Sequence, residues 1–317
     1  MRRTKVSIIG AGNVGSTAAM RIAHRNLGDI VLLDVDPGVA KGKALDILEM
    51  APVEGFESNL LGTSDYADTK GSDVVVICAG AARRPGMSRD DLLSTNASIV
   101  RSAVEMALKW SPEAFLIVVT NPVDAMTTLA KTVSGLPRER VMGMAGVLDS
   151  ARLRAFIGQE LDFSPADVHT MVLGGHGDDM VPIIRYTTVG GIPVSYLLPA
   201  DTIEHLVQRA RAGGGEIVNL LQSGSAFYAP GAAITRMVDS LLGRKRRIIN
   251  ISAYLEGEYG HRGVCAGVPG MVGPAGLEKI IELDLEPSEQ EAFARFVARQ
   301  RALVQQLVSA GFMPAPA

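Results

Sequence analysis

The sequence predicts an α/β protein in which a doubly wound parallel sheet is followed by a second, α+β domain. Three observations support this fold class. Short continuous apolar runs alternate with helical patterns in the first half, a glycine-rich turn follows the first run, and longer helical patterns dominate the second half. Continuous apolar strands separated by helices are typical of a parallel sheet covered on both faces.

Apolar runs in the first half predict strands, and the patterns between them predict helices. The predicted strands are residues 5–9, 30–34, 73–77 and 115–119, with a last short strand at 141–145. The predicted helices are residues 15–26, 42–50 and 91–109. This alternation of strands and helices favours a first domain that spans residues 1–145.

The pattern changes after about residue 145 and predicts a second domain of residues 146–317. Its predicted helices are residues 149–159, 200–213 and 287–307, and its predicted strands are 168–173, 181–188 and 248–255. Gly213, Gly214 and Gly215 conflict with a helix, because each glycine costs about 1 kcal/mol relative to alanine. Close packing against another part of the chain, or a kink, would explain them.

Composition excludes several classes of protein. The chain has 317 residues, a formal net charge of -3 and 47% hydrophobic residues, so it predicts about two globular domains and no nucleic-acid binding. The basic run 244–247 has no interleaved aromatic residues and is interpreted as a solvated turn or an inter-subunit contact. Cys78 and Cys265 form neither a disulfide framework nor a metal site, which favours a cytoplasmic protein.

No segment is predicted to direct the chain to a membrane or out of the cell. Two arginines precede the apolar run 6–9, but Gly10 and Gly12 interrupt that run before it reaches the length of an export signal. No apolar stretch approaches the roughly 20 residues that a bilayer requires. A protein without membrane association is therefore expected.

The turn after the first strand fits the dinucleotide-binding fingerprint of a Rossmann-type sheet. It consists of Gly10, Ala11, Gly12, Asn13, Val14 and Gly15. The first glycine permits the tight turn, the second lets the backbone approach a pyrophosphate, and the third lets helix and strand pack closely. The pyrophosphate would lie at the helix N-terminus, where free N–H groups favour negative charge.

Asp34 ends the second predicted strand, 19 residues after Gly15, close to the spacing at which such sites carry an acid for the ribose hydroxyls. An aspartate there repels a 2′-phosphate, and Val35 follows it rather than an arginine. NAD is therefore favoured over NADP. The alternative is a strand-end aspartate that caps a turn.

Three further clusters carry candidate chemistry. Asp149 and Arg152 can project from one face of a helix, and His176 lies in a glycine-rich turn. A histidine titrates near neutrality, and a carboxylate bonded to one ring nitrogen would fix its tautomer. Taken alone, a histidine beside glycines is more often structural.

The run Arg83-Arg84-Pro85-Gly86-Met87-Ser88-Arg89 adds several guanidinium groups, each of which alone would be interpreted as a solvated surface charge. Arginines that hold carboxylates, together with a proton-transferring histidine and its aspartate, suit a small dicarboxylic acid. The reaction would be redox at its alcohol or ketone carbon.

Together these residues resemble the lactate/malate dehydrogenase superfamily, and most closely its lactate-dehydrogenase-like malate dehydrogenases. The likeness extends over residues 5–307. Its motifs are GAGNVG at 10–15, ARRPGMSRDDL at 82–92, VTNPVD at 119–124, LDSARLR at 148–154 and GGHGD at 174–178.

The resemblance implies a role for each site residue. His176 would be the proton donor and acceptor, with Asp149 as its partner, and Arg152 would form a bidentate pair with the C1 carboxylate. Arg89 would lie on a mobile loop that closes and polarises the reacting carbonyl, and Asn121 would bond the substrate oxygen. The nicotinamide side of the cofactor site would be lined by Asn96, Val119, Thr120 and Asn121.

Arg83 occupies the position that, in this superfamily, tends to be arginine in malate enzymes and glutamine in lactate enzymes. An arginine there would pair with the second carboxylate of oxaloacetate, whereas pyruvate would leave it unpaired. The resemblance thus implies reversible, metal-free, NAD-dependent oxidation of (S)-malate to oxaloacetate, a step of the tricarboxylic acid cycle. L-lactate or another 2-hydroxy acid is the alternative substrate.

The resemblance also implies a homo-oligomer, either a dimer or a tetramer. Two alternatives from other classes remain open at this point. A metal-dependent, NAD-using glycoside hydrolase shares the architecture but would need a metal site that the sequence does not offer. A non-catalytic NAD-binding protein would have no reason to keep His176, Asp149 and three site arginines together.

Overall fold

The computed structural model describes residues 2–81, 89–243 and 245–316, with the backbone but not the side chain of Arg89. Six parallel strands form one half of its large sheet, in the order β3-β2-β1-β4-β5-β6. These strands are β1 (Lys5–Ile9), β2 (Asp29–Leu33), β3 (Leu60–Thr63), β4 (Val74–Ile77), β5 (Phe115–Val118) and β6 (Val141–Gly143). The side chains of β1, β2, β4, β5 and β6 are almost entirely buried because helices cover both faces, whereas Leu61 of the edge strand β3 is exposed.

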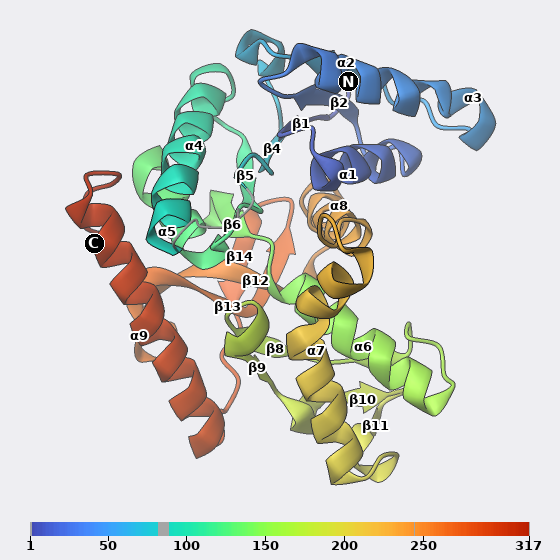
Figure 1. Ribbon diagram of the computed structural model, residues 1–317, viewed down its shortest axis with the longest axis vertical. Coiled ribbons are helices and arrows are strands. Elements are labelled where there is room, and N and C mark those ends of the chain that lie inside the picture. The colour runs from blue at the N-terminus through green and yellow to red at the C-terminus, as the bar shows by residue number, and fades with distance from the viewer. Residues whose placement is uncertain (1, 82–88, 244, 317) are drawn as a thin grey trace.

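Helices lie on both sides of the parallel strands (Figure 1). On one side are α1 (Asn13–His24), α2 (Pro37–Glu49) and the short α3 (Ala51–Glu54), and on the other are α4 (Arg89–Trp110) and α5 (Val123–Ser134). The predicted Rossmann-type, doubly wound sheet is therefore confirmed.

The large sheet continues into the second half of the chain through antiparallel strands. Strand β12 (Arg247–Glu256) pairs with β6 and β13 (Arg262–Gly273), and β13 pairs with β8 (Val172–Gly174) and β14 (Gly276–Ile280). Strand β9 (Met180–Pro182) completes the order. A separate small sheet contains β7 (Val168–His169), β10 (Thr188–Val189) and β11 (Ile192–Pro193).

Four long helices complete the second half. They are α6 (Gly146–Leu161), α7 (Ala200–Leu221), α8 (Tyr228–Leu242) and α9 (Pro287–Ser309). Helix α8 packs on α1, and α9 packs on α5 and β13. The main apolar core includes residues from both halves, such as Ile8 and Phe296, while a second core joins α6 to α7. The division at residue 145 stays a prediction.

Several expectations for individual elements were wrong in detail. Residues 181–188 do not form one strand, because Pro182 ends β9 and a 3-10 turn (Ile184–Tyr186) precedes β10. Residues 168–173 divide between β7 and β8, which belong to different sheets. Helix α7 continues through Gly213, Gly214 and Gly215 to Leu221, so the predicted conflict at the glycines does not end the helix.

Candidate active site

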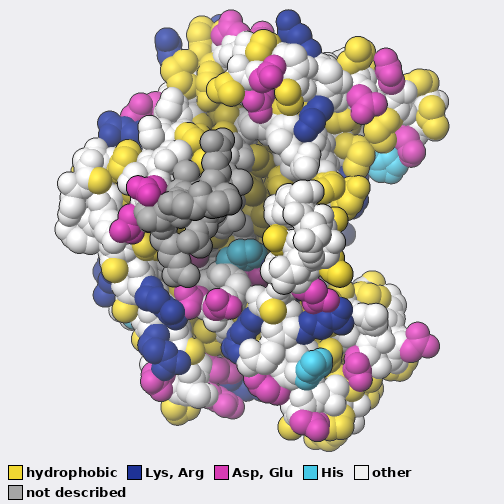
Figure 2. Space-filling model, viewed as in Figure 1, with side chains coloured by type: hydrophobic (Ala, Val, Ile, Leu, Met, Phe, Trp, Pro, Cys, Tyr) yellow, Lys and Arg dark blue, Asp and Glu magenta, His cyan; other side chains and the backbone are white. Residues whose placement is uncertain are grey.

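A cavity of about 840 Å³ opens where α6, α7 and the turn after β8 meet. Among its lining residues are Arg152 from α6, Arg211 and Glu216 from α7, and His176. Figure 2 shows a hollow in the middle of this face with a histidine side chain inside it. The volume lies in the range that binds small ligands and parts of cofactors.

His176, which lines this cavity, forms a close pair with the buried Asp149 of α6. The imidazole Nδ1 lies 3.0 Å from Oδ2 and 2.9 Å from Oδ1 of Asp149. The Asp149 side chain is only 1% exposed, whereas that of His176 is 30% exposed. Because Nδ1 faces the aspartate, the second ring nitrogen, Nε2, is the one that remains for a ligand.

The turn that holds His176 depends on its glycines. Gly174 has φ +79, and a Cβ there would lie 2.6 Å from the carbonyl oxygen of Asp179. A Cβ on Gly175 would lie 2.5 Å from the Phe296 ring of α9. Asp179, in the 3-10 turn that follows His176, pairs with Arg299 of the same helix. Helix α9 therefore supports the back of the histidine turn.

The surroundings of His176 raise its pKa above the ordinary 6.5. Burial by itself would lower the pKa of the imidazole. The hydrogen bond and the negative charge of Asp149 oppose burial, and the net shift is upward despite the nearby charge of Arg152. The imidazolium is thus stabilised near neutral pH, which suits a group that donates a proton.

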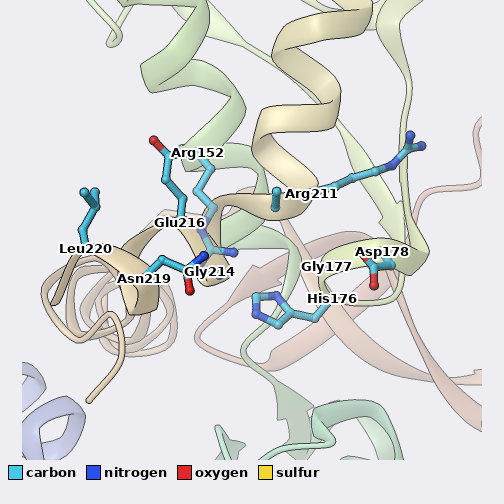
Figure 3. Close-up of a pocket in the computed structure, with 11 residues that line it drawn as sticks. Arg152, His176, Gly177, Asp178, Arg211, Gly214, Glu216, Asn219 and Leu220 are labelled. Atoms are coloured by element: carbon cyan, nitrogen blue, oxygen red, sulfur yellow. The ribbon is translucent and has the colours of Figure 1, made fainter. Parts of the chain in front are cut away.

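Arg152 lies beside this pair, one helical turn after Asp149. Its Nη1 is 3.5 Å from Oδ1 of Asp149, and its side chain is 10% exposed. Figure 3 shows the guanidinium between α7 and His176, at the wall of the cavity. The Asp149 contact is longer than a good hydrogen bond, so the guanidinium keeps its N–H donors for an anionic group.

Asp124 on α5 is a buried acid that the sequence analysis did not single out as a site residue. The hydroxyl of Ser252 donates to its Oδ1 at 2.6 Å. Burial raises the pKa of this carboxyl to about 7, and the charges of His176, Asp149 and Asp179 also act on it. It is the last residue of the VTNPVD motif, so the motif was visible but the burial of its acid was not.

The glycine-rich turn has the shape that the fingerprint predicts. Gly10 has φ +104, and a Cβ there would lie 2.6 Å from the backbone nitrogen of Ala79. A Cβ on Gly15 would lie 1.9 Å from the Gly10 carbonyl oxygen, whereas one on Gly12 would meet nothing within 4 Å. Gly10 and Gly15 therefore serve the packing of the turn, and Gly12 faces open space at the N-terminus of α1.

That open space fits a dinucleotide pyrophosphate. Gly12 is the N-cap of α1, and no side chain of the described residues caps the helix, so the N–H groups of its first turn have no side-chain acceptor among them. A pyrophosphate would accept from these groups and gain from the helix dipole. Asn13 and Val14 begin the helix, and the Ala11 carbonyl accepts from Lys43.

Asp34 lies directly after β2 and bonds to the turn itself. Its Oδ2 accepts from the Ala11 backbone N–H at 2.7 Å, and its Oδ1 accepts from that of Asp36 at 3.1 Å. Both bonds agree with the turn-capping alternative. Each carboxylate oxygen has a second acceptor position, so the ribose contact stays open as a prediction.

The predicted nicotinamide-side residues gather after β5. Val119, Thr120 and Asn121 follow that strand, and Asn96 of α4 reaches them, because its Nδ2 donates to the Asn121 carbonyl at 2.7 Å. The Asn96 Oδ1 accepts from the Ala81 N–H at 2.7 Å. Asn96 therefore links the ends of β4 and β5 at the edge where doubly wound sheets bind ligands.

Arg83 and the side chain of Arg89 lie outside the described residues, so their predicted contacts are not part of this geometry. Within residues 2–81, 89–243 and 245–316, no three His, Cys, Asp or Glu side chains gather as a metal site would require. No helix in this part of the chain is long and apolar enough to cross a membrane.

Two family models together match nearly the whole chain. Residues 4–143 match the NAD-binding domain of lactate/malate dehydrogenase, and residues 146–309 match the α/β C-terminal domain. The chain belongs to the lactate/malate dehydrogenase family. The predictions of this family, of an enzyme and of NAD as cofactor are confirmed.

Individual relatives give a finer comparison. A malate dehydrogenase of Desulforudis audaxviator is 59% identical over 97% of this chain and 99% of its own length. The solved malate dehydrogenase of Picrophilus torridus is 47% identical, with a TM-score of 0.94 and 98% of each chain covered. A solved lactate dehydrogenase of Cryptosporidium parvum, in complex with lactic acid and NAD, is 40% identical with a TM-score of 0.93, covering 97% and 98%. The fold therefore does not separate the two activities.

Proposed function

We propose that this chain is an NAD-dependent malate dehydrogenase that interconverts (S)-malate and oxaloacetate. The buried Asp149 paired with Nδ1 of His176, beside Arg152, is the observation that carries the proposal. Relatives at 52–59% identity over nearly their full length are malate dehydrogenases, and they support the substrate. The cofactor would be held by residues 1–145 and the substrate mainly by residues 146–317.

His176 moves the proton. In the direction of oxaloacetate reduction, the protonated imidazole donates from Nε2 to the carbonyl oxygen, since Nδ1 is held by Asp149. In the reverse direction neutral Nε2 accepts the hydroxyl proton of malate, and Asp149 stabilises the imidazolium that forms. NAD, when bound, accepts the hydride from malate, and its reduced form supplies the hydride to oxaloacetate.

The arginines bind and orient the substrate. Arg152 pairs with the C1 carboxylate, for which its low exposure and its donors that face the cavity are suited. Arg83 pairs with the distal carboxylate, Arg89 polarises the carbonyl, and Asn121 bonds the substrate oxygen. Most of the rate enhancement comes from the positioning of the substrate and from fixed positive charge near the developing alkoxide.

The cofactor residues act mainly through the backbone. The turn formed by Gly10, Ala11, Gly12, Asn13, Val14 and Gly15 receives the pyrophosphate, and Asp34 bonds the ribose hydroxyls. Asn96, Val119, Thr120 and Asn121 line the nicotinamide side. Asp34 also makes the enzyme prefer NADH to NADPH. The ratio of kcat/KM with NADH to kcat/KM with NADPH tests this preference.

The substrate assignment is tested by comparing oxaloacetate with pyruvate in an NADH absorbance assay. Oxaloacetate is expected to be preferred by several orders of magnitude in kcat/KM. Arg83→Gln should lower kcat/KM for oxaloacetate by roughly 30- to several-thousand-fold, the range for the loss of a desolvated charged pair. The same change should raise kcat/KM for pyruvate. Arg152→Gln should lower kcat/KM for both substrates, because both carry the C1 carboxylate.

L-lactate is the second candidate substrate. The similarity to a 40% identical lactate dehydrogenase is the reason that pyruvate, its oxidised form, is included in the assay. Comparable efficiency on oxaloacetate and pyruvate would contradict the malate assignment. If Arg83→Gln lowers kcat/KM for both substrates equally, Arg83 does not determine the substrate specificity.

A cytoplasmic homo-oligomer is the form we propose for the enzyme. Both cysteines are free, in agreement with a reducing compartment. Large apolar side chains are exposed on neighbouring helices, with Leu45 of α2 at 56% and Val53 of α3 at 84%. A partner subunit would cover them. Light scattering coupled to size-exclusion chromatography measures the mass, and a monomer would contradict the proposal.

A further inference from the structure

Three consecutive glycines lie in the middle of α7, where a helix is weakened by each of them. The helix nevertheless continues from Ala200 to Leu221. Some other requirement must therefore keep side chains away from this turn. The surroundings of each glycine show what the requirement is.

The Arg152 side chain lies against two of these positions, tightly at Gly213 and in ordinary contact at Gly214. A Cβ on Gly213 would lie 3.2 Å from Cδ and 3.5 Å from Nε of Arg152. A Cβ on Gly214 would lie 3.5 Å from Nη2 and 3.9 Å from Nη1, and one on Gly215 would meet nothing within 4 Å. Figure 3 shows the guanidinium next to Gly214, with His176 beyond it.

The other contacts of Arg152 do not fix its position by themselves. Asp149 is 3.5 Å from Nη1, which restrains one end of the guanidinium only weakly. The backbones of α6 and α7 are held at a set distance, because Leu153 and Ile157 of α6 and Ala210 of α7 belong to one buried core. The glycine surface of α7 is therefore the rigid wall along which the arginine stem lies.

We propose that Gly213 and Gly214 are positioning residues that set the place of the Arg152 guanidinium in the substrate cavity. The inference rests on the proposed role of Arg152 in binding the C1 carboxylate. A bidentate pair tolerates little displacement, since a shift of about 1 Å in a positioning group costs roughly 10²-fold in rate. A Cβ at residue 213 would require the arginine stem to give way by a few tenths of an ångström.

The first test is Gly213→Ala, with Gly42→Ala as the matched control. Gly42 is an exposed glycine inside α2 whose Cβ would meet nothing within 4 Å. Both changes favour the helix, so the Tm of each variant should equal or exceed that of the parent. Gly213→Ala should raise the KM for oxaloacetate by about 3- to 10-fold, with a smaller change in kcat and an unchanged Kd for NADH. Gly42→Ala should leave all three constants unchanged.

The size of the effect should follow the contact distances. Gly214→Ala should raise KM less than Gly213→Ala, because 3.5 Å is an ordinary contact and 3.2 Å is a tight one. Gly213→Val should raise KM further, and kcat/KM should fall by about 10²-fold if Arg152 moves by about 1 Å. An unchanged KM in Gly213→Ala would overturn the proposal, whether or not the valine variant folds.

A double-mutant cycle separates this proposal from the role of Arg152 itself. If the glycine acts through the arginine, Gly213→Ala should have no further effect on KM in an Arg152→Gln background. An equal effect in both backgrounds would overturn the positioning role. If Arg152→Gln alone leaves KM unchanged, the proposed substrate contact of Arg152 fails instead, and the two failures are thereby distinguished.

Discussion

The cofactor turn and the substrate cavity are built by opposite means. In the turn after β1, Gly10, Gly12 and Gly15 shape a site from backbone, and what matters is the absence of side chains. In the cavity, Asp149 and Arg152 of α6 and His176 of the turn after β8 supply charge and protons from their side chains. The first site is therefore local in sequence, whereas the second exists only after α6, α7 and the turn after β8 have packed.

This contrast has a physical consequence for mutations. A backbone site is lost by adding atoms, because a new side chain displaces either the turn or its ligand. A side-chain site is lost by removing atoms or charge, since its function lies in the group that is deleted.

His176→Ala should lower kcat by about 10²- to 10⁴-fold, the range for the loss of a general acid and base. NADH binding should remain nearly intact, because the histidine lies in the substrate cavity. Steady-state kinetics gives kcat, and NADH fluorescence titration gives Kd. Retained turnover would assign the proton transfer to another residue.

For oxaloacetate reduction, Asp149→Asn should move the falling limb of the profile of kcat/KM against pH to lower pH. Reduction needs the imidazolium, so its kcat/KM falls as pH rises through the pKa of His176. Burial lowers that pKa, and Asp149 is what raises it above 6.5. Without the carboxylate, the midpoint of the falling limb should lie below pH 6.5. The kcat/KM for oxaloacetate at pH 8 should then drop by at least about 10-fold.

A pH profile of kcat/KM from pH 5 to 9 measures this limb in both proteins. Malate oxidation needs neutral His176, so its rising limb should shift to lower pH by the same amount. A limb that does not move in Asp149→Asn would show that the aspartate orients the ring without setting its protonation.

Gly12→Ala and Gly15→Ala should separate ligand contact from packing in the cofactor turn. A Cβ on Gly12 would meet no atom of the described residues within 4 Å, so the Tm without cofactor should be unchanged while the Kd for NADH rises about 10-fold. A Cβ on Gly15 would overlap the Gly10 carbonyl, so the Tm itself should fall. Equal losses of Tm in the two variants would contradict the different roles of these glycines.

The sequence predicted the parallel sheet and the cofactor turn because both leave local signals. Strands β1 and β4 are continuous buried runs, and the glycine spacing is fixed by one turn. Strand β13 was missed because Gly267, Pro269 and Gly270 disagree with strand propensity. In the structure a Cβ on Gly267 would lie 2.3 Å from the Gly174 carbonyl oxygen, so this glycine serves packing between strands.

Helix α5 and the buried acid at its start were missed for a related reason. Residues 123–130 are all buried, so the helix has no polar face there to show a helical period. The motifs predicted that Asp149 and His176 act together, but only the packing of α6 against the turn after β8 shows their distance. Arg83 was identified by resemblance alone, and its role stays a prediction.

Asp124→Asn should have a smaller effect than Asp149→Asn and should test whether charges beyond Asp149 act on His176. Asp124 lies on α5 and is acted on by Asp149 of α6, by His176, and by Asp179 of the following turn, while Ser252 of β12 donates to it. Its pKa is about 7, so its charge develops mainly above that pH, and this charge raises the pKa of His176. Removing it should move the His176 limb to lower pH, by less than Asp149→Asn does.

Ser252→Ala provides the matched variant for this last prediction. The serine hydrogen bond lowers the pKa of Asp124, so its loss should leave Asp124 less ionised at a given pH. The His176 limb should then shift in the same direction as in Asp124→Asn, by a smaller amount, with the Kd for NADH unchanged. A shift to higher pH in either variant would show that Asp124 does not act on His176 through its charge, and that the proton-transfer site ends at Asp149.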